Sequence, residues 1–250
     1  MKIRVLDSSG LVASVAVVEN DTLLAEYTVN YKKTHSQTLL PMLDEISNMT
    51  ELDLSTIDAI AVAGGPGSFT GLRIGSATAK GLGLALEKPL ISIPTTAAIA
   101  YNIWDTDKFV CPIMDARRNQ VYTGVYCYTD HRLDTVWEQD TMSIEALAEG
   151  LNCLDHEVIF LGDGVAVYRE KLEALLTIPF SFAPAHVNRQ RAAAVGALAE
   201  VYYKEGKIQT AEEHEPEYLR KSQAERERAE RESVKHADVV KKQENGEKSE

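Results

Sequence analysis

The residues with the clearest chemical potential lie in the glycine-rich stretch 64–75, which reads GGPGSFTGLRIG. It follows an apolar run at 57–63 and precedes a helical pattern, so it forms the turn from a buried strand into a helix. Backbone N–H groups at such a turn can bind an anion, and Gly67 and Ser68 are the candidate contacts. A tight turn in which Ser68 or Thr70 caps the helix would have the same sequence. The stretch also lacks the lysine of a Gly-x4-Gly-Lys-Ser/Thr phosphate loop.

Two other turns carry side chains that could contact an anion. Asp7 and Ser9 end the first expected strand, just before Gly10. An aspartate and small hydroxyl residues at this turn face the metal and phosphates in actin-like ATPases, although a turn stabilised by Asp and Ser would look the same. Arg117 lies in the matching turn of the second half, where an actin-like nucleotide site needs glycines. An anion there would contact the arginine side chain rather than a backbone cradle.

Motifs for metal binding and nucleophilic catalysis are missing from the sequence. No two of the six histidines are three or four residues apart, so no helical His pair can hold a metal. No Gly-x-Ser-x-Gly nucleophile elbow occurs. We therefore predict no catalytic residue and no metal site.

The helix expected at 70–86 has small residues at every fourth position, and Gly81 adds a further glycine. Each glycine inside a helix costs about 1 kcal/mol relative to alanine, so we expect another element to pack closely on this stripe. Packing within the same lobe is one interpretation, and an intersubunit helix face is the other. The helix expected at 36–49, which has an apolar face, is the natural companion. On the second interpretation, the partner interface comprises Leu39, Met42, Leu43, Ile46, Gly71, Gly75, Ala79 and Gly83.

The order of expected elements is β-β-β-α-β-α, and it occurs twice, beginning again near Phe109. This order predicts an α/β fold with two similar lobes, and 250 residues suffice for two lobes of about 100 residues each. We place the N-terminal lobe at 1–104 and the C-terminal lobe, including the terminal helix, at 105–220. Residues 221–250 are a charged tail with almost no apolar content, which we expect to be disordered.

Charge and composition limit the partners. The formal net charge is −12, and the tail contributes equal numbers of acidic and basic side chains, so the body carries the whole excess. Such a body repels nucleic acid, so if RNA is the substrate we expect its contact with this chain to be only indirect, through another subunit. The sequence shows no signal peptide or membrane span, and its three scattered cysteines are typical of a reducing cytoplasm.

The chain resembles the bacterial TsaB (YeaZ) family, and the glycine-rich stretch matches the family hallmark almost letter for letter. Departures are slight: Ser8 stands where threonine is usual, and Gln37 where glutamate is common. The segments that carry the resemblance are 5–9 with 14–16, 35–41, 65–75, 115–117 with 121–122 and, more weakly, 216–220.

The resemblance implies a two-lobed actin/Hsp70-like (ASKHA, ribonuclease H-like) fold. It also implies a non-catalytic subunit that dimerises with and activates the catalytic relative TsaD, together with the ATPase TsaE. That complex transfers a threonylcarbamoyl group from an adenylate to adenosine 37 of tRNAs reading ANN codons. ATP and metal belong to the partner subunits, this chain needs no cofactor of its own, and it forms a homodimer when the partner is absent.

The resemblance also sets this chain apart from its catalytic relative. TsaD has a His-x-x-x-His metal pair just after a Pro-Leu strand, and Thr95 and Ile99 occupy those two places here. Neither side chain can replace an imidazole on iron or zinc. The alternatives are an independently active ASKHA-type ATPase or carbamoyltransferase, and a metallopeptidase. The missing turn glycines disfavour the first, and the missing ligands disfavour the second.

Overall fold

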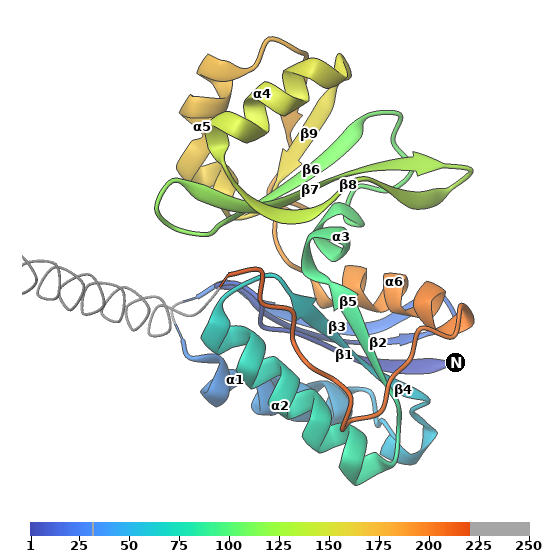
Figure 1. Ribbon diagram of the computed structural model, residues 1–250. Coiled ribbons are helices and arrows are strands. Elements are labelled where there is room, and N and C mark those ends of the chain that lie inside the picture. Colours follow the sequence, from blue (N-terminus) through green and yellow to red (C-terminus); the bar gives the residue numbers. More distant parts are fainter. Residues whose placement is uncertain (32, 221–250) are drawn as a thin grey trace, which may run out of the picture. The chain divides into compact units, whose positions relative to one another are not determined.

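The computed structural model describes residues 1–31 and 33–220 (Figure 1). Met1–Tyr218 forms one compact unit. The charged tail predicted at 221–250 lies outside the described residues.

The first half of the chain builds a five-stranded sheet in the order β3-β2-β1-β4-β5. Strands β1 to β3 form an antiparallel meander, whereas β4 and β5 run parallel to β1. The strands are β1 (Lys2–Asp7), β2 (Ala13–Glu19), β3 (Thr22–Val29), β4 (Ala59–Gly65) and β5 (Leu90–Pro94).

A second sheet repeats this topology in the order β10-β9-β6-β7-β8. Its first three strands again form an antiparallel meander, and the last two run parallel to the first of them. The predicted duplication and α/β class are therefore confirmed. The strands are β6 (Phe109–Asp115), β7 (Gln120–Thr129), β8 (Arg132–Ser143), β9 (Val158–Leu161) and β10 (Phe180–Phe182).

Helices α1 (His35–Met49) and α2 (Phe69–Leu86) pack on one face of the first sheet. Ser68 caps α2 by accepting a hydrogen bond from the Gly71 N–H at 3.3 Å, as one sequence interpretation required. The helix ends at Glu87, which adopts a left-handed conformation. A short 3-10 turn, Leu54–Thr56, leads from α1 into β4. No helix in the described part of the chain is long and apolar enough to cross a membrane.

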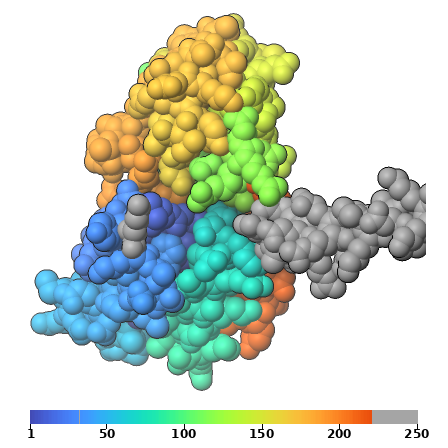
Figure 2. All heavy atoms as spheres, turned by 90° about the vertical axis from the view of Figure 1, so that its left-hand side faces the viewer, coloured from blue at the N-terminus to red at the C-terminus, as the bar shows by residue number. Residues whose placement is uncertain are grey.

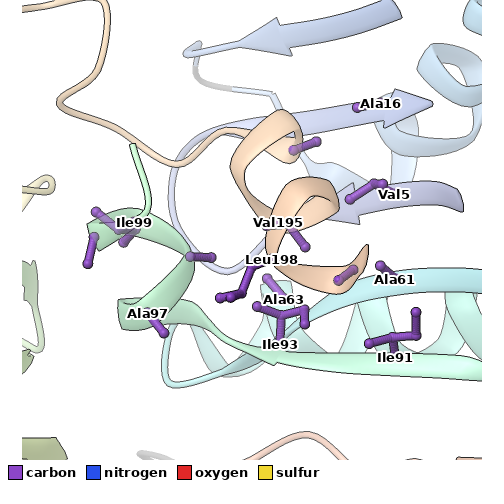
Figure 3. Close-up of a cluster of buried hydrophobic side chains, with 14 of the residues drawn as sticks. Val5, Ala16, Ala61, Ala63, Ile91, Ile93, Ala97, Ile99, Val195 and Leu198 are labelled. Atoms are coloured by element: carbon purple, nitrogen blue, oxygen red, sulfur yellow. The ribbon is translucent and has the colours of Figure 1, made fainter. Parts of the chain in front are cut away.

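The terminal helix α6 (Ala192–Lys204) packs on the opposite face of the first sheet, not on the second sheet. Its Val195 and Leu198 belong to the same core as Val5 of β1 and Ala61 of β4 (Figure 3). This differs from our expectation that α6 belongs with the C-terminal lobe. Helical periodicity shows that one face of α6 is apolar but cannot show which sheet receives it. The lobe boundary near residue 104 remains a prediction.

A short helix that the sequence did not predict, α3 (Thr95–Ala100), continues this core toward the second sheet. Its alanines and Ile99 are buried in one cluster with Met114 of β6 and Tyr126 of β7. The outer face of the second sheet is covered by α4 (Ile144–Leu154) and α5 (Gly164–Leu175), which have their own core.

Candidate functional site

The glycine-rich stretch packs against the turn at the end of β1. A Cβ atom at Gly67 would overlap with the backbone carbonyl of Ser9, and one at Gly71 with that of Ser8. The N–H of Ser68 donates to the Ser9 carbonyl at 2.7 Å. These glycines therefore allow α2 to start in direct contact with β1, which is packing within one lobe.

The other half of the stretch contacts the end of the compact unit. A Cβ atom at Gly65 would overlap with the carbonyl of Glu217, and the Glu217 N–H donates to the Gly64 carbonyl at 2.7 Å. Gln139 of β8 donates to the Glu217 carboxylate at 2.6 Å and to the Gly65 carbonyl at 3.3 Å. The turn is thus joined to both the second lobe and the segment 208–218.

Thr95 and Ile99, the two places that the resemblance assigns to metal ligands in a catalytic relative, are used for packing in this chain. Thr95 is fully buried, and its hydroxyl accepts a hydrogen bond from the Gly65 N–H at 3.1 Å. Ile99 is buried in the core that runs through α3. Across residues 1–31 and 33–220, no cluster of three or more His, Cys, Asp or Glu side chains is arranged to hold a metal ion.

Polar atoms without partners gather at the β1 turn. Asp7 is fully buried, and its Oδ1 accepts from the Ser9 N–H at 2.8 Å. Its Oδ2, the Ser9 hydroxyl and both amide atoms of the buried Gln190 have no hydrogen-bond partner among the described residues. Gln190 lies against Gly10, whose carbonyl contacts His35 Nε2 at 2.8 Å. Burial raises the pKa of Asp7, although hydrogen bonds from Ser9 oppose that shift.

The predicted anion contacts lie in two different places. Four of them lie together in the first lobe: Asp7, Ser9, Gly67 and Ser68. The turn after β1 and the glycine-rich turn pack directly against each other there. Arg117 lies in the turn between β6 and β7, where its N–H donates to Asp115 at 2.9 Å and its guanidinium approaches the same carboxylate at 3.9 Å. The Ser68 N–H is already used by the Ser9 carbonyl. A role for these residues in anion binding stays a prediction.

The eight residues predicted as a partner interface lie inside the first lobe. The four from α1 are at most 4% exposed and belong to the core beneath α1 and α2. Gly75 faces Ser8 and β1, and Gly83 faces Leu90 and Ala211. Because these residues are buried, a partner that binds α1 and α2 must contact other residues of the two helices. The buried set is Leu39, Met42, Leu43, Ile46, Gly71, Gly75, Ala79 and Gly83.

The outward surfaces of α1 and α2 also carry apolar side chains, which are exposed to solvent. The two helices lie in the blue and teal lower part of Figure 2. Leu40 is 56% exposed, Met49 76% and Leu84 57%. No described atom lies within 4 Å of a Cβ placed at Gly81, so this glycine serves no close packing within the described chain. Sequence reasoning singled out the buried small stripe and missed this exposed one. Its signal in the sequence was the spacing of Ala77, Gly81 and Leu84, which lie on one face of the helix.

Two five-stranded sheets of one topology, each flanked by helices, define an actin-like (ASKHA) protein. The same fold occurs in the crystal structure of inorganic polyphosphate/ATP-glucomannokinase from Arthrobacter sp. strain KM. The TM-score is 0.50 at 16% sequence identity, and the match covers 81% of this chain and 99% of that one. At this identity the likeness shows the fold alone.

The sequence comparisons are more specific. Residues 22–228 match the family described as TsaD: tRNA N6-adenosine threonylcarbamoyltransferase. The tRNA threonylcarbamoyladenosine biosynthesis protein TsaB of Bacillus subtilis is 32% identical over 225 residues, and that of Escherichia coli is 29% identical over 232 residues. Each match covers 90% of this chain and 96% of the relative. YeaZ from Pseudomonas aeruginosa has a TM-score of 0.74 at 27% identity, covering 87% and 99% of the two chains. The chain belongs to the TsaB family of tRNA threonylcarbamoyladenosine biosynthesis proteins.

Proposed function

We propose that this protein is a non-catalytic partner subunit that dimerises with and activates a TsaD-like transferase, working with a TsaE-like ATPase. The product is N6-threonylcarbamoyladenosine at position 37 of tRNAs reading ANN codons. The observation that carries the proposal is the outward face of α2, where Gly81 meets no other described part of the chain and lies one helical turn from the exposed Ala77 and Leu84.

A glycine in an exposed helix position costs about 1 kcal/mol relative to alanine. Gly71 offsets that cost by letting α2 approach β1, but Gly81 has no such contact in the described chain. Another protein that packs its backbone closely against α2 would supply the missing compensation. Exposed Leu84, one helical turn from Gly81, would lose water-accessible apolar surface in the same contact.

The proposal that this subunit performs no chemistry is supported by what occupies the relevant positions. Thr95 and Ile99 are buried where the catalytic relative places its metal pair, and the hallmark turn is filled by the protein's own backbone. The net charge of −12 favours leaving tRNA contact to another subunit. We propose that ATP and metal act on the partner subunits.

Substitution of Gly81 tests the docking surface without disturbing the core. Gly81→Gln places a long side chain on the outer face of α2, where it meets no described atom, so the variant should melt at or above the wild-type temperature. We expect its affinity for a TsaD-like subunit to fall at least about tenfold. The matched control is Ala166→Gln, an exposed position on α5. Unchanged affinity of the Gly81 variant would refute docking through α2.

The functional assay reconstitutes tRNA modification from purified subunits, omitting each in turn. Modified tRNA should require both this chain and the TsaD-like subunit, and Gly81→Gln should lower the yield while Ala166→Gln does not. Modification by this chain in the absence of TsaD would show that it carries the chemistry itself.

A further inference from the structure

A surface pocket of about 410 Å³ lies at the carboxyl end of α2. One wall is the last turn of α2 with the residues that follow it, and the other is the segment 208–213. Gln209 fixes that second wall by exchanging backbone hydrogen bonds with Leu90 of β5, at 2.8 and 3.0 Å. The lining includes Leu84, Pro89, Ile208, Glu87, Glu212 and Glu213.

The pocket combines apolar walls with negative charge. Leu84 is 57% exposed and Ile208 48% exposed, so both can cover an incoming apolar stem. Three carboxylates line the pocket against the single ammonium group of Lys88. The carboxyl end of α2 adds the negative end of its helix dipole. A cationic group on an apolar stem has the matching chemistry, and arginine is such a side chain.

An exposed arginine lies near the opposite end of the same helix. The Arg73 guanidinium stacks on the ring of Phe69 with its central carbon 4.4 Å from the ring centroid, and Phe69 packs on Tyr218 with centroids 4.8 Å apart. Arg73 therefore points toward the amino end of α2, as helical side chains do. The stacked ring holds the guanidinium in place before any partner arrives.

The outward residues of α2 are spaced symmetrically about Ala77. Thr70 and Leu84 are equally far from it along the helix, and so are Arg73 and Gly81. If two copies of α2 cross antiparallel at Ala77, each Arg73 lies opposite the other copy's Gly81, where no side chain obstructs it. Because Arg73 points back toward Phe69, its guanidinium lies opposite Leu84 to Glu87 of the other copy, at the pocket.

We propose that the acidic pocket at the end of α2 receives Arg73 of a second copy of this chain, and that this contact fixes an antiparallel register centred on Ala77. The proposal rests on the proposed function in one respect, because both use the outer face of α2. It adds the occupant of the pocket, the side chain that enters it and the register of the two helices.

Charge reversal tests the contact in the full-length chain by sedimentation equilibrium. Arg73→Glu should raise the dimer dissociation constant at least about tenfold, since it places like charges together in both symmetric pockets. The double variant Glu87→Lys/Glu212→Lys should do the same. Combining all three substitutions should recover at least half of the lost affinity on a logarithmic scale. Arg132→Glu and Glu170→Lys, at exposed positions of the second lobe, are the matched controls and should leave the constant unchanged.

Gly81→Gln separates failure of this inference from failure of the proposed function. If Gly81→Gln disrupts the dimer while the charge reversals leave it intact, the α2 face docks a partner but the pocket does not receive Arg73. If neither kind of variant affects the dimer, or the wild-type chain stays monomeric at high concentration, this contact between copies does not exist. Absence of rescue in the combined variant overturns the pairing of Arg73 with these carboxylates.

Discussion

The backbone N–H of Ser68 donates a hydrogen bond to the carbonyl oxygen of Ser9, at 2.7 Å. The residue that caps α2 is thereby tied to the turn that ends β1. Each of these turns alone has a sequence that could bind an anion, but in the folded chain they contact each other. The family hallmark in this protein thus has a structural explanation, which is close approach of a helix to a strand end.

Two alanine substitutions in α2 should have opposite effects on stability. In Gly71→Ala the new Cβ overlaps with the Ser8 carbonyl, so the backbone must shift, and the free energy of unfolding should fall by about 1–3 kcal/mol. Gly81→Ala should raise it by up to about 1 kcal/mol because only helix propensity changes. Urea denaturation of both variants measures the difference. Equal effects would contradict the assignment of Gly71 to the buried face of α2 and Gly81 to its exposed face.

Removal of Gln139 should weaken the connection between the lobes. This side chain donates to Glu217 and Gly65, and its Oε1 accepts from the Thr96 hydroxyl at 2.7 Å. Gln139→Ala removes these three hydrogen bonds and should lower the free energy of unfolding by about 1–2 kcal/mol. Glu138→Ala, at the exposed neighbouring position, is the control. A melting temperature equal to that of the control would show that the network contributes nothing.

Stability should depend on the ionisation of Asp7. Burial raises the folded-state pKa of Asp7 above the unfolded value of about 3.9, so the folded state holds its proton to higher pH. Stability is therefore lost as pH rises from the unfolded pKa through the folded one. Asp7→Asn removes this dependence while keeping an acceptor for the Ser9 N–H. The difference in unfolding free energy between Asp7→Asn and wild type, measured by urea titration, should increase from pH 4 upward. A difference that does not change with pH would contradict a buried Asp7 carboxylate whose Oδ2 has no partner among the described residues.

The cysteines should differ sharply in reactivity. Burial raises the pKa of the Cys111 thiol to about 12, so almost no thiolate exists at neutral pH, whereas Cys153 is exposed. Iodoacetamide should alkylate Cys153 in the native protein and reach Cys111 only after unfolding. Peptide mass spectrometry before and after adding urea reads out both sites, and rapid native labelling of Cys111 would contradict its burial.

The elements with strong periodicity were predictable from sequence. Alternating and continuous apolar runs located β1, β2 and β4, and the spacing of Leu39, Met42, Leu43 and Ile46 located α1. The short α3 was not predictable, because every residue of it is buried and it shows no polar face. Strand β10 has only three residues, all partly exposed, which is too short for a pattern.

The candidate interface shows a different limit of sequence reasoning. Gly75 and Gly81 are both small residues in one helix, and nothing in their types shows that one faces β1 and the other faces outward. That distinction depends on where the sheet lies. Likewise Glu217 is far from Gly64 in the chain, so no local pattern predicts that it completes the hallmark turn.

The position of Glu217 also affects how the protein emerges during synthesis. The first lobe requires α6 on its sheet and the segment through Glu217 against Gly64 and Gly65, yet both are translated after the whole second sheet. The first sheet is therefore synthesised with one apolar face exposed. Synthesis of the second sheet is complete before α6 can cover that face. Nascent chains shorter than about 200 residues should accordingly be those most dependent on chaperones.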